Sequence, residues 1–287
     1  MRFTWMKEHS ERFAVEPMCQ VLEVSKSGYY AWLKRPVSQR QVRGQELAAK
    51  VRQAYQASHR TYGSPRVHQE LIADGEKVCR NTVAKIMRNE RIRSVIARRF
   101  VVHTTDSNHG HPVVENRLGR DFAAAAPNRK WCADITYVPT GQGTLYLAAV
   151  IDLCSRKIIG WSMRENMPVD LVADALKMAL ARRQPGPGLL HHSDRGVQYA
   201  CGIYQDLLGE HGIECSMSRV GNCYDNAVME SFWGTLKTEC TYPHGAYATF
   251  DQARRSIFEY IEMFYNRTRR HSSLGYVSPE SFEAALN

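Results

Sequence analysis

The order of strand and helix patterns after residue 130 constrains the fold more than any other feature of this sequence. WCADITYVP, TLYLAAVIDL and KIIGWSM follow one another with short turns between them, and each is rich in strand-forming residues. Strands joined this closely pair antiparallel in the simplest arrangement. A helix, the short strand LLHHSD, a second helix, the strand IECSMS and a last helix follow. The sequence therefore predicts an α/β fold with a mixed sheet and helices on its faces.

Three acidic residues stand where this predicted sheet would bring distant parts of the chain together. Asp134 lies in the first strand, Asp194 follows LLHHSD, and Glu230 lies on the last helix. Carboxylate oxygens are suitable ligands for Mg²⁺, which needs few of them because it keeps several waters. In a two-metal site, one ion activates the attacking oxygen and the other stabilises the leaving oxygen at phosphorus. We expect two Mg²⁺ ions, for which Mn²⁺ could substitute, with Asp134 as the shared ligand.

Each of these residues also has a purely structural interpretation. Backbone groups can satisfy an aspartate in an apolar strand, and a glutamate on a helix is usually exposed. Neighbouring acidic residues have similar surroundings, because Asp152 ends a strand, Asp225 could cap the helix that carries Glu230, and Glu239 follows on that helix. The order aspartate, aspartate, glutamate on strand, strand and helix favours the first three. Because crowded carboxylates repel, we expect weak metal binding until DNA phosphates arrive.

Basic residues are concentrated in the first part of the chain. The net charge is +9; residues 1–120 contain 22 Lys and Arg against 11 Asp and Glu, and the remainder contains 16 against 18. An excess of positive charge in one region is typical of a protein that binds a polyanion. The alternative is a protein that is merely well solvated.

Two helical regions in this basic part have the size of helix-turn-helix units. Residues 14–35 predict helix, tight turn and helix, with Ser25 or Ser27 as the second N-cap. Residues 45–93 predict three helices, the third capped by Asn81. Packed helical hairpins that do not bind DNA have the same pattern as the first region, and the second could bind DNA either by reading bases or by contacting phosphates alone. The predicted DNA contacts on the third helix and just after it are Lys85, Arg88, Arg91 and Arg93.

The end of the chain carries a second group of predicted DNA contacts. A helix is expected over residues 250–266, followed by NRTRRHSSLGYVSP. The basic cluster in this segment could instead be a solvated end of the chain. Its members are Arg267, Arg269, Arg270 and His271.

Other features exclude several classes of protein. The eight cysteines form no CxxC pair, so we expect reduced thiols and no zinc-bound HHCC domain. The histidines between residues 94 and 128 lack further ligands at zinc-finger spacing. No apolar run approaches the roughly 18 residues that span a membrane, and the first residues lack a signal-peptide pattern. A cytoplasmic protein is expected.

These patterns divide the chain into five regions. They are an N-terminal helical segment, a helix-turn-helix-like DNA-binding domain, a linker, a catalytic core, and a C-terminal helix with a basic tail. The predicted boundaries are 1–40, 41–98, 99–124, 125–245 and 246–287.

The spacing of the acidic residues resembles that of a known family. There are 59 residues between Asp134 and Asp194 and 35 between Asp194 and Glu230, a pattern similar to that of DDE transposases and retroviral integrases. Around them, WCADITYV, HHSDRGVQY, GNCYDNAVMESFWGTLKTE and YNRTRRHSSLGYVSP closely resemble the transposase encoded by the second reading frame (OrfB) of a large family of bacterial insertion sequences. YGSPRVHQEL and NTVAKIMRNERI resemble that family's helix-turn-helix-like module. The resemblance covers nearly the whole chain.

The resemblance implies a ribonuclease H-like, integrase-type core that cleaves and rejoins DNA. Water would cut a phosphodiester at an element end, and the freed 3′-hydroxyl would attack a second phosphodiester. Lys237, seven residues after Glu230 as in the family, is expected to contact DNA near the active site. The implied partners are terminal inverted repeats, target DNA, the upstream-frame (OrfA) product or its fusion, and further copies of this chain. Since residues 1–40 show no leucine zipper, we expect the second-frame portion alone.

Two other functions compete with a transposase. The first is a DNA-binding regulator with an inactive integrase-like core, against which the intact acidic residues argue. The second is a structure-specific nuclease, which would need little of the sequence recognition that two helical DNA-binding units provide.

Overall fold

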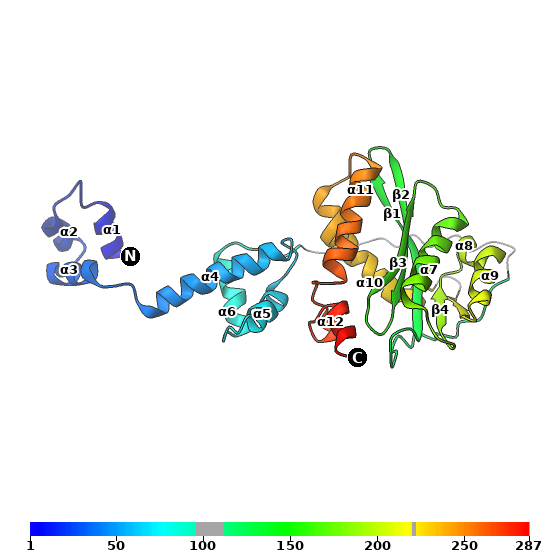
Figure 1. Ribbon diagram of the computed structural model, residues 1–287. Helices are drawn as coiled ribbons and strands as arrows, with labels where there is room; N and C mark the ends of the chain where they lie inside the picture. Colours follow the sequence, from blue (N-terminus) through cyan, green and yellow to red (C-terminus); the bar gives the residue numbers. More distant parts are fainter. Residues whose placement is uncertain (96–111, 220–221, 287) are drawn as a thin grey trace. The chain divides into compact units, whose positions relative to one another are not determined.

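The computed structural model describes residues 1–95, 112–219 and 222–286 (Figure 1). The chain forms two compact units, Met1–Gln53 and Ala54–Asn287. The division between the two units falls within one helix, α4 (Gln39–Ala57). It does not test the predicted boundaries of the five regions, which stay a prediction.

The first unit is a small helical cluster. Its core contains Met6, Met18, Cys19 and Tyr29. The side chain of Ser25 accepts a hydrogen bond from the Gly28 amide at 3.0 Å, so Ser25 is the N-cap of the third helix. The first helix was not predicted from the sequence. The helices that precede α4 are α1 (Arg2–Glu8), α2 (Val15–Val21) and α3 (Lys26–Lys34).

The second unit begins with the helix pair α5 (Ser64–Ala73) and α6 (Arg80–Asn89). Pro65 lies in the first turn of α5, where its missing amide costs nothing. The predicted cap of α6 is wrong, because Arg80 and Asn81 are already helical and Cys79 occupies the N-cap position. The buried face of α6 consists of Val83 and Met87.

A five-stranded mixed sheet forms the centre of the second unit. The strand order is β3-β2-β1-β4-β5; β1 pairs antiparallel with β2, β2 pairs antiparallel with β3, and the pairs β1–β4 and β4–β5 are parallel. This is the ribonuclease H-like arrangement predicted from the sequence. The strands are β1 (Lys130–Thr140), β2 (Gly143–Asp152), β3 (Ile158–Arg164), β4 (Leu190–Ser193) and β5 (Glu214–Met217).

Helices cover both faces of this sheet (Figure 1). On one face, α7 lies so close to β3 that a Cβ added to Gly160 would be 2.1 Å from the carbonyl oxygen of Ala175. Glycine at residue 160 is therefore required for this packing. The apolar core on this face includes Trp131 and Ala133 of β1. The covering helices are α7 (Val169–Arg183), α8 (Val197–Ala200) and α9 (Gly202–Glu210) on one face, and α10 (Ala227–Leu236) and α11 (Phe250–Phe258) on the other.

Both helices of the second face continue into π-helical segments. Lys237–Thr241 follows α10 directly, and Glu259–Tyr265 follows α11. Such wider turns occur frequently at functional sites. The chain then forms the short helix α12 (Pro279–Ala284). No helix within the described ranges is long and apolar enough to cross a membrane.

Candidate active site

Asp134 lies on β1, the central strand of the sheet. Alternation along the strand places it on the face opposite to Trp131 and Ala133. Its Oδ2 accepts a hydrogen bond of 2.9 Å from the indole Nε1 of Trp233, and its Oδ1 accepts one of 2.8 Å from the Ile135 amide. Both carboxylate oxygens are thus held in defined directions.

The helix α10 brings Glu230 to the same face. Trp233 lies one turn after Glu230, so the bond from Trp233 to Asp134 anchors that turn against β1. Asn226, just before the helix, also donates to the carbonyl oxygen of Ala133 at 3.2 Å. These two bonds fix the helix that carries Glu230 to the strand that carries Asp134.

The i, i+4 and i+8 spacing of Val228, Phe232 and Leu236 predicts that these three residues form the buried face of α10, and the structure differs. Val228 is only partly buried, whereas Met229 and Trp233 are fully packed beside Phe232 and Leu236. The reason is that Trp233 turns toward β1 to reach a carboxylate, which rotates the buried stripe toward Met229.

Asp194 reaches the site through the parallel pairing of β4 with β1. The last paired residues are Cys132 and His192, and each aspartate lies two residues beyond its member of this pair. Neighbouring strands lie about 4.8 Å apart, so this register places Asp194 beside Asp134. The Oδ1 of Asp194 accepts a hydrogen bond of 2.9 Å from the Gly196 amide.

The three carboxyl groups interact electrostatically. Burial raises the pKa of Asp134 to about 8, and the negative charges of Asp194 and, more weakly, Glu230 contribute to this increase. The hydrogen bonds from Trp233 and Ile135 oppose it. Within the described ranges, however, no three His, Cys, Asp or Glu side chains are grouped tightly enough to hold a metal ion as they stand. The carboxyl groups therefore influence one another without forming a finished ligand cluster.

Lys237 is buried at the start of the π-helical segment. Its side chain is not on a solvated surface, since the residue is only 5% exposed. The ammonium lies 4.8 Å from the ring centroid of Tyr137, which is on β1. Burial lowers the pKa of Lys237 to about 8, and the charge of Asp134 opposes this shift. A cation is therefore held near the acidic residues.

The neighbouring acidic residue Asp152 is structural. It is fully buried, and its Oδ2 accepts hydrogen bonds from the Asn128 amide at 2.7 Å and the Trp131 indole at 3.3 Å. Its Oδ1 accepts bonds from the amides of Cys154 and Ser155. Four hydrogen bonds to this carboxylate thus stabilise the chain at the end of β2.

Asp225 and Glu239 are also held by other parts of the fold. Asp225 does not cap α10 with its side chain; it accepts bonds from Arg219 and Arg120, and the Arg219 side chain strongly lowers its pKa. Glu239 forms a two-bond ion pair with Arg269, at 2.6 and 2.7 Å. Both carboxylates have cationic partners and hold segments of the chain together.

The two groups of predicted DNA contacts differ in exposure. All four basic residues on and just after α6 are exposed. In the C-terminal cluster, Arg269 is 4% exposed, His271 is 7% exposed, and Arg270 is paired with Glu70 at 2.8 Å. These three do not form a basic surface, because their side chains are used inside the fold. Arg267 remains exposed, with a loose ion pair to Glu280 at 3.7 Å.

The residues that position the acidic groups were not predicted from the sequence. Trp233 and Asn226 both flank Glu230 on or beside α10, and both donate hydrogen bonds to β1. The only signal in the sequence was a tryptophan one helical turn after the glutamate, on the apolar face.

Comparison with known families agrees with this architecture. Models described as integrase core domains match residues 124–223 and 211–279, and a model described as an HTH-like domain matches residues 43–100. The sheet order and these matches define an integrase-type catalytic core with a helix-turn-helix-like domain before it, which is the architecture of an enzyme that transfers DNA strands.

Relatives identify the family. The chain is 44% identical over 286 residues to the transposase InsF for insertion sequence IS3A of Escherichia coli (strain K12), covering 99% of this chain and 98% of the relative. It is 46% identical over 265 residues to an uncharacterized 31 kDa protein of insertion element IS600 of Shigella sonnei, covering 92% and 97%. The simian T-cell lymphotropic virus intasome aligns at 13% identity with a TM-score of 0.48, covering 82% of this chain and 74% of that chain. This chain belongs to the family of IS3-type insertion-sequence transposases, which are polynucleotidyl transferases.

Proposed function

We propose that this transposase cleaves DNA at the ends of its element with Asp134, Asp194 and Glu230, and then joins the freed 3′-hydroxyl to a second phosphodiester. The observation that carries the proposal is the hydrogen bond from Trp233 to Asp134, which fixes the helix of Glu230 to the strand of Asp134. The register of β4 adds Asp194 to the same end of the sheet.

The donor set fits divalent magnesium. All three side chains offer oxygen ligands, and the negative charges of Asp194 and Glu230 add to the effect of burial in raising the pKa of Asp134. Asp134, Asp194 and Glu230 would hold the cations in their deprotonated form, and the cations would offset the repulsion among the three carboxylates. A pair of Mg²⁺ ions, or Mn²⁺ in their place, would activate the attacking oxygen and stabilise the leaving oxygen. In this proposal Asp134 would be a ligand of both ions.

Other residues of the chain hold the DNA in this proposal. The ammonium of Lys237, which is buried beside the ring of Tyr137, would bind a phosphate near the acidic residues. The exposed basic residues of α6 bind the terminal inverted repeat, and Arg267 adds a further phosphate contact. Bringing two element ends together requires at least two copies of the chain. The OrfA product, or a fusion with it, supplies additional contacts in the cytoplasm.

The test compares wild type with Asp134→Asn on labelled duplex DNA that carries the element's terminal repeat, in the presence of Mg²⁺. We expect the variant to bind DNA with unchanged affinity and to lose cleavage and strand transfer by at least about a hundredfold. Asp206→Asn, the same change at an exposed position on α9, should behave as wild type. A fully active Asp134→Asn variant would refute the assignment. Binding without cleavage by the wild type would indicate a regulator, and cleavage without joining would indicate a nuclease.

A further inference from the structure

Two sequence stretches, to which the catalytic proposal assigns only a phosphate contact by Arg267, meet inside the second unit. YGSPRVHQEL contributes residues near and on α5, and NRTRRHSSLGY contributes residues after the last π-helical segment. Glu239, from the segment that follows α10, joins them. We call this cluster the clamp, and its members are Tyr62, Arg66, Glu70, Glu239, Arg269 and Arg270.

The centre of the clamp is a buried ion pair. The guanidinium of Arg269 donates two hydrogen bonds to the two oxygens of Glu239, at 2.6 and 2.7 Å, and the two side chains are 5% and 7% exposed. The hydroxyl of Tyr260 donates a third bond to Glu239 at 2.9 Å. Charge-assisted, two-bond pairs of this type fix both position and orientation.

The helix α5 and Tyr62, just before it, are attached to the region around this centre by four contacts. Arg66 donates to the carbonyl oxygen of Arg270 at 2.9 Å, and its guanidinium lies 3.7 Å from Glu239. The Tyr62 hydroxyl accepts a bond from the Arg270 amide at 2.7 Å. In the opposite direction, the Arg270 side chain donates to Glu70 at 2.8 Å. The helix-turn-helix-like domain is therefore fixed to the catalytic core through specific polar groups.

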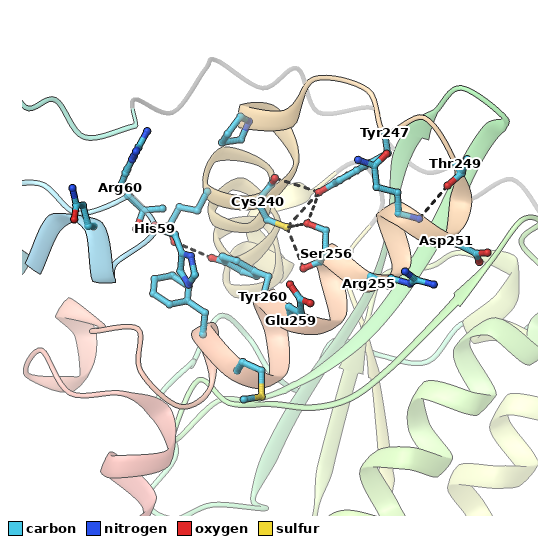
Figure 2. A pocket seen from close by; sticks show the side chains of 17 residues that line it. His59, Arg60, Cys240, Tyr247, Thr249, Asp251, Arg255, Ser256, Glu259 and Tyr260 are labelled. Carbon is cyan, nitrogen blue, oxygen red and sulfur yellow. Dashed lines mark hydrogen bonds between the residues drawn. The ribbon is translucent and has the colours of Figure 1, made fainter. Parts of the chain in front are cut away.

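Beside the clamp, the same two parts of the second unit face each other across a cavity of about 1250 Å³. Figure 2 shows His59 and Arg60 on one side and Cys240, Ser256 and Tyr260 on the other. The aromatic contacts of His59 and Tyr62 with Phe264 join the two parts as well, so the clamp supplies the polar share of their attachment.

The clamp is continuous with the proposed active site. Glu239 and Lys237 belong to the same π-helical segment, which follows directly on the helix that carries Glu230. A helix-turn-helix-like domain held at Glu239 is therefore held at a fixed distance from the acidic residues.

We propose that the clamp sets which phosphodiester is cut, by fixing the distance between the DNA sequence bound by α6 and the acidic residues that cleave. This inference rests on the proposed function, since it requires α6 to bind the repeat and the three carboxylates to cut it. The covalent segment between residues 95 and 112 joins the same two parts of the chain, but in this proposal it does not set the distance.

The first test weakens the clamp without leaving an isolated buried charge. The double variant is Arg66→Met with Glu70→Gln. Glu239 then keeps its ion pair with Arg269, and Arg270 keeps its hydrogen bond to the carbonyl oxygen of Tyr276. Lys77→Met with Asp74→Asn makes the same charge changes at exposed positions of the same domain. Cleavage positions are mapped on end-labelled duplex carrying the terminal repeat. We expect about tenfold less cutting at the wild-type position, with new cuts at neighbouring phosphodiesters, in the clamp variant alone.

The second test lengthens the covalent connection and leaves the clamp intact. A Gly-Ser-Gly-Ser insertion between residues 95 and 112 should leave the cut where it is in wild type, and the same insertion in the clamp variant should spread the cuts further. The inference is overturned if the insertion alone moves the cut, or if a folded clamp variant cuts as wild type does. If wild type itself shows no Mg²⁺-dependent cleavage, the proposed function fails instead, so the two failures are distinguishable.

Discussion

The indole of Trp233 and the carboxylate of Asp134 are joined by a hydrogen bond of 2.9 Å between residues 99 positions apart in the sequence. The bond connects the helix that carries Glu230 to the central strand. It also leaves the other carboxylate oxygen of Asp134 with a single backbone donor, the Ile135 amide. Trp233 thus orients the residue that we propose as the shared metal ligand.

Replacing Trp233 by Phe should slow cleavage while preserving the fold. The aromatic ring that packs against Phe232 is kept, but the donor to Asp134 is lost. Partners that orient a metal ligand typically contribute about tenfold to a hundredfold to activity or metal affinity. We expect a loss of this size in single-turnover cleavage, with unchanged DNA affinity. Trp161→Phe, which removes an indole donor to Glu262 outside the site, is the matched control and should cleave normally.

Replacing Arg269 by Met should destabilise the protein severely. The change removes the two-bond partner of a buried carboxylate, and breaking one member of such a pair costs about 3–5 kcal/mol. Arg267→Met, at an exposed position two residues earlier, should change the free energy of unfolding by less than about 0.5 kcal/mol. Denaturant unfolding of both variants measures the difference. Equal stabilities would show that Arg269 is not a structural residue.

His271 should make the fold sensitive to acid. Burial, together with the charges of Arg269 and Arg66, lowers its pKa to about 3, whereas an unfolded histidine titrates near about 6.5. Between these values the unfolded chain binds a proton that the folded chain does not, so stability falls as the pH drops through this window. The loss from this group at pH 5 relative to pH 7 is about 2 kcal/mol.

The variant His271→Asn tests this directly by urea unfolding at the two pH values. Between pH 7 and pH 5, the free energy of unfolding of this variant should fall by about 2 kcal/mol less than that of wild type. His211→Asn, at an exposed position, should lose as much stability as wild type. An unchanged loss in His271→Asn would show that His271 does not titrate abnormally.

Arg88 should bind DNA mainly through phosphate. It is exposed on α6, and each phosphate contact lowers the slope of log affinity against log salt by about 0.9. We expect Arg88→Ala to weaken binding of repeat and unrelated DNA alike and to reduce that slope by about this amount. Fluorescence anisotropy over a salt series measures both. A loss confined to the repeat sequence would instead indicate that Arg88 reads a base.

The sheet could be predicted because its information is local. Alternating apolar residues predicted β1 and β2 almost to their ends. The two-residue connection between Thr140 and Gly143 required these strands to pair antiparallel. The order of the remaining elements then limited the fold to few alternatives. The cap of α6 was missed because Cys79 is a poor capping residue, and tertiary packing decided where the helix begins.

The roles of the C-terminal arginines could not be predicted, because an arginine looks the same in sequence whether it faces a phosphate or a buried carboxylate. The partner of Arg269 is 30 residues away, and the partner of Arg270 is 200 residues away. Only the folded chain shows that these cations are already paired. For Asp152, likewise, three of the four donors that make it structural come from loops whose paths the sequence pattern does not give, and the fourth is the indole of Trp131 on β1.

The position of α10 late in the chain has a consequence for synthesis on the ribosome. The helices α5 and α6 and the hairpin of β1 and β2 consist of local contacts and can form as soon as they emerge, but Glu230 arrives only after all five strands. A nascent or prematurely terminated chain therefore carries the DNA-binding helices before it has a complete set of acidic residues. With α6 binding the repeat as we propose, such a fragment would occupy element ends without cutting them.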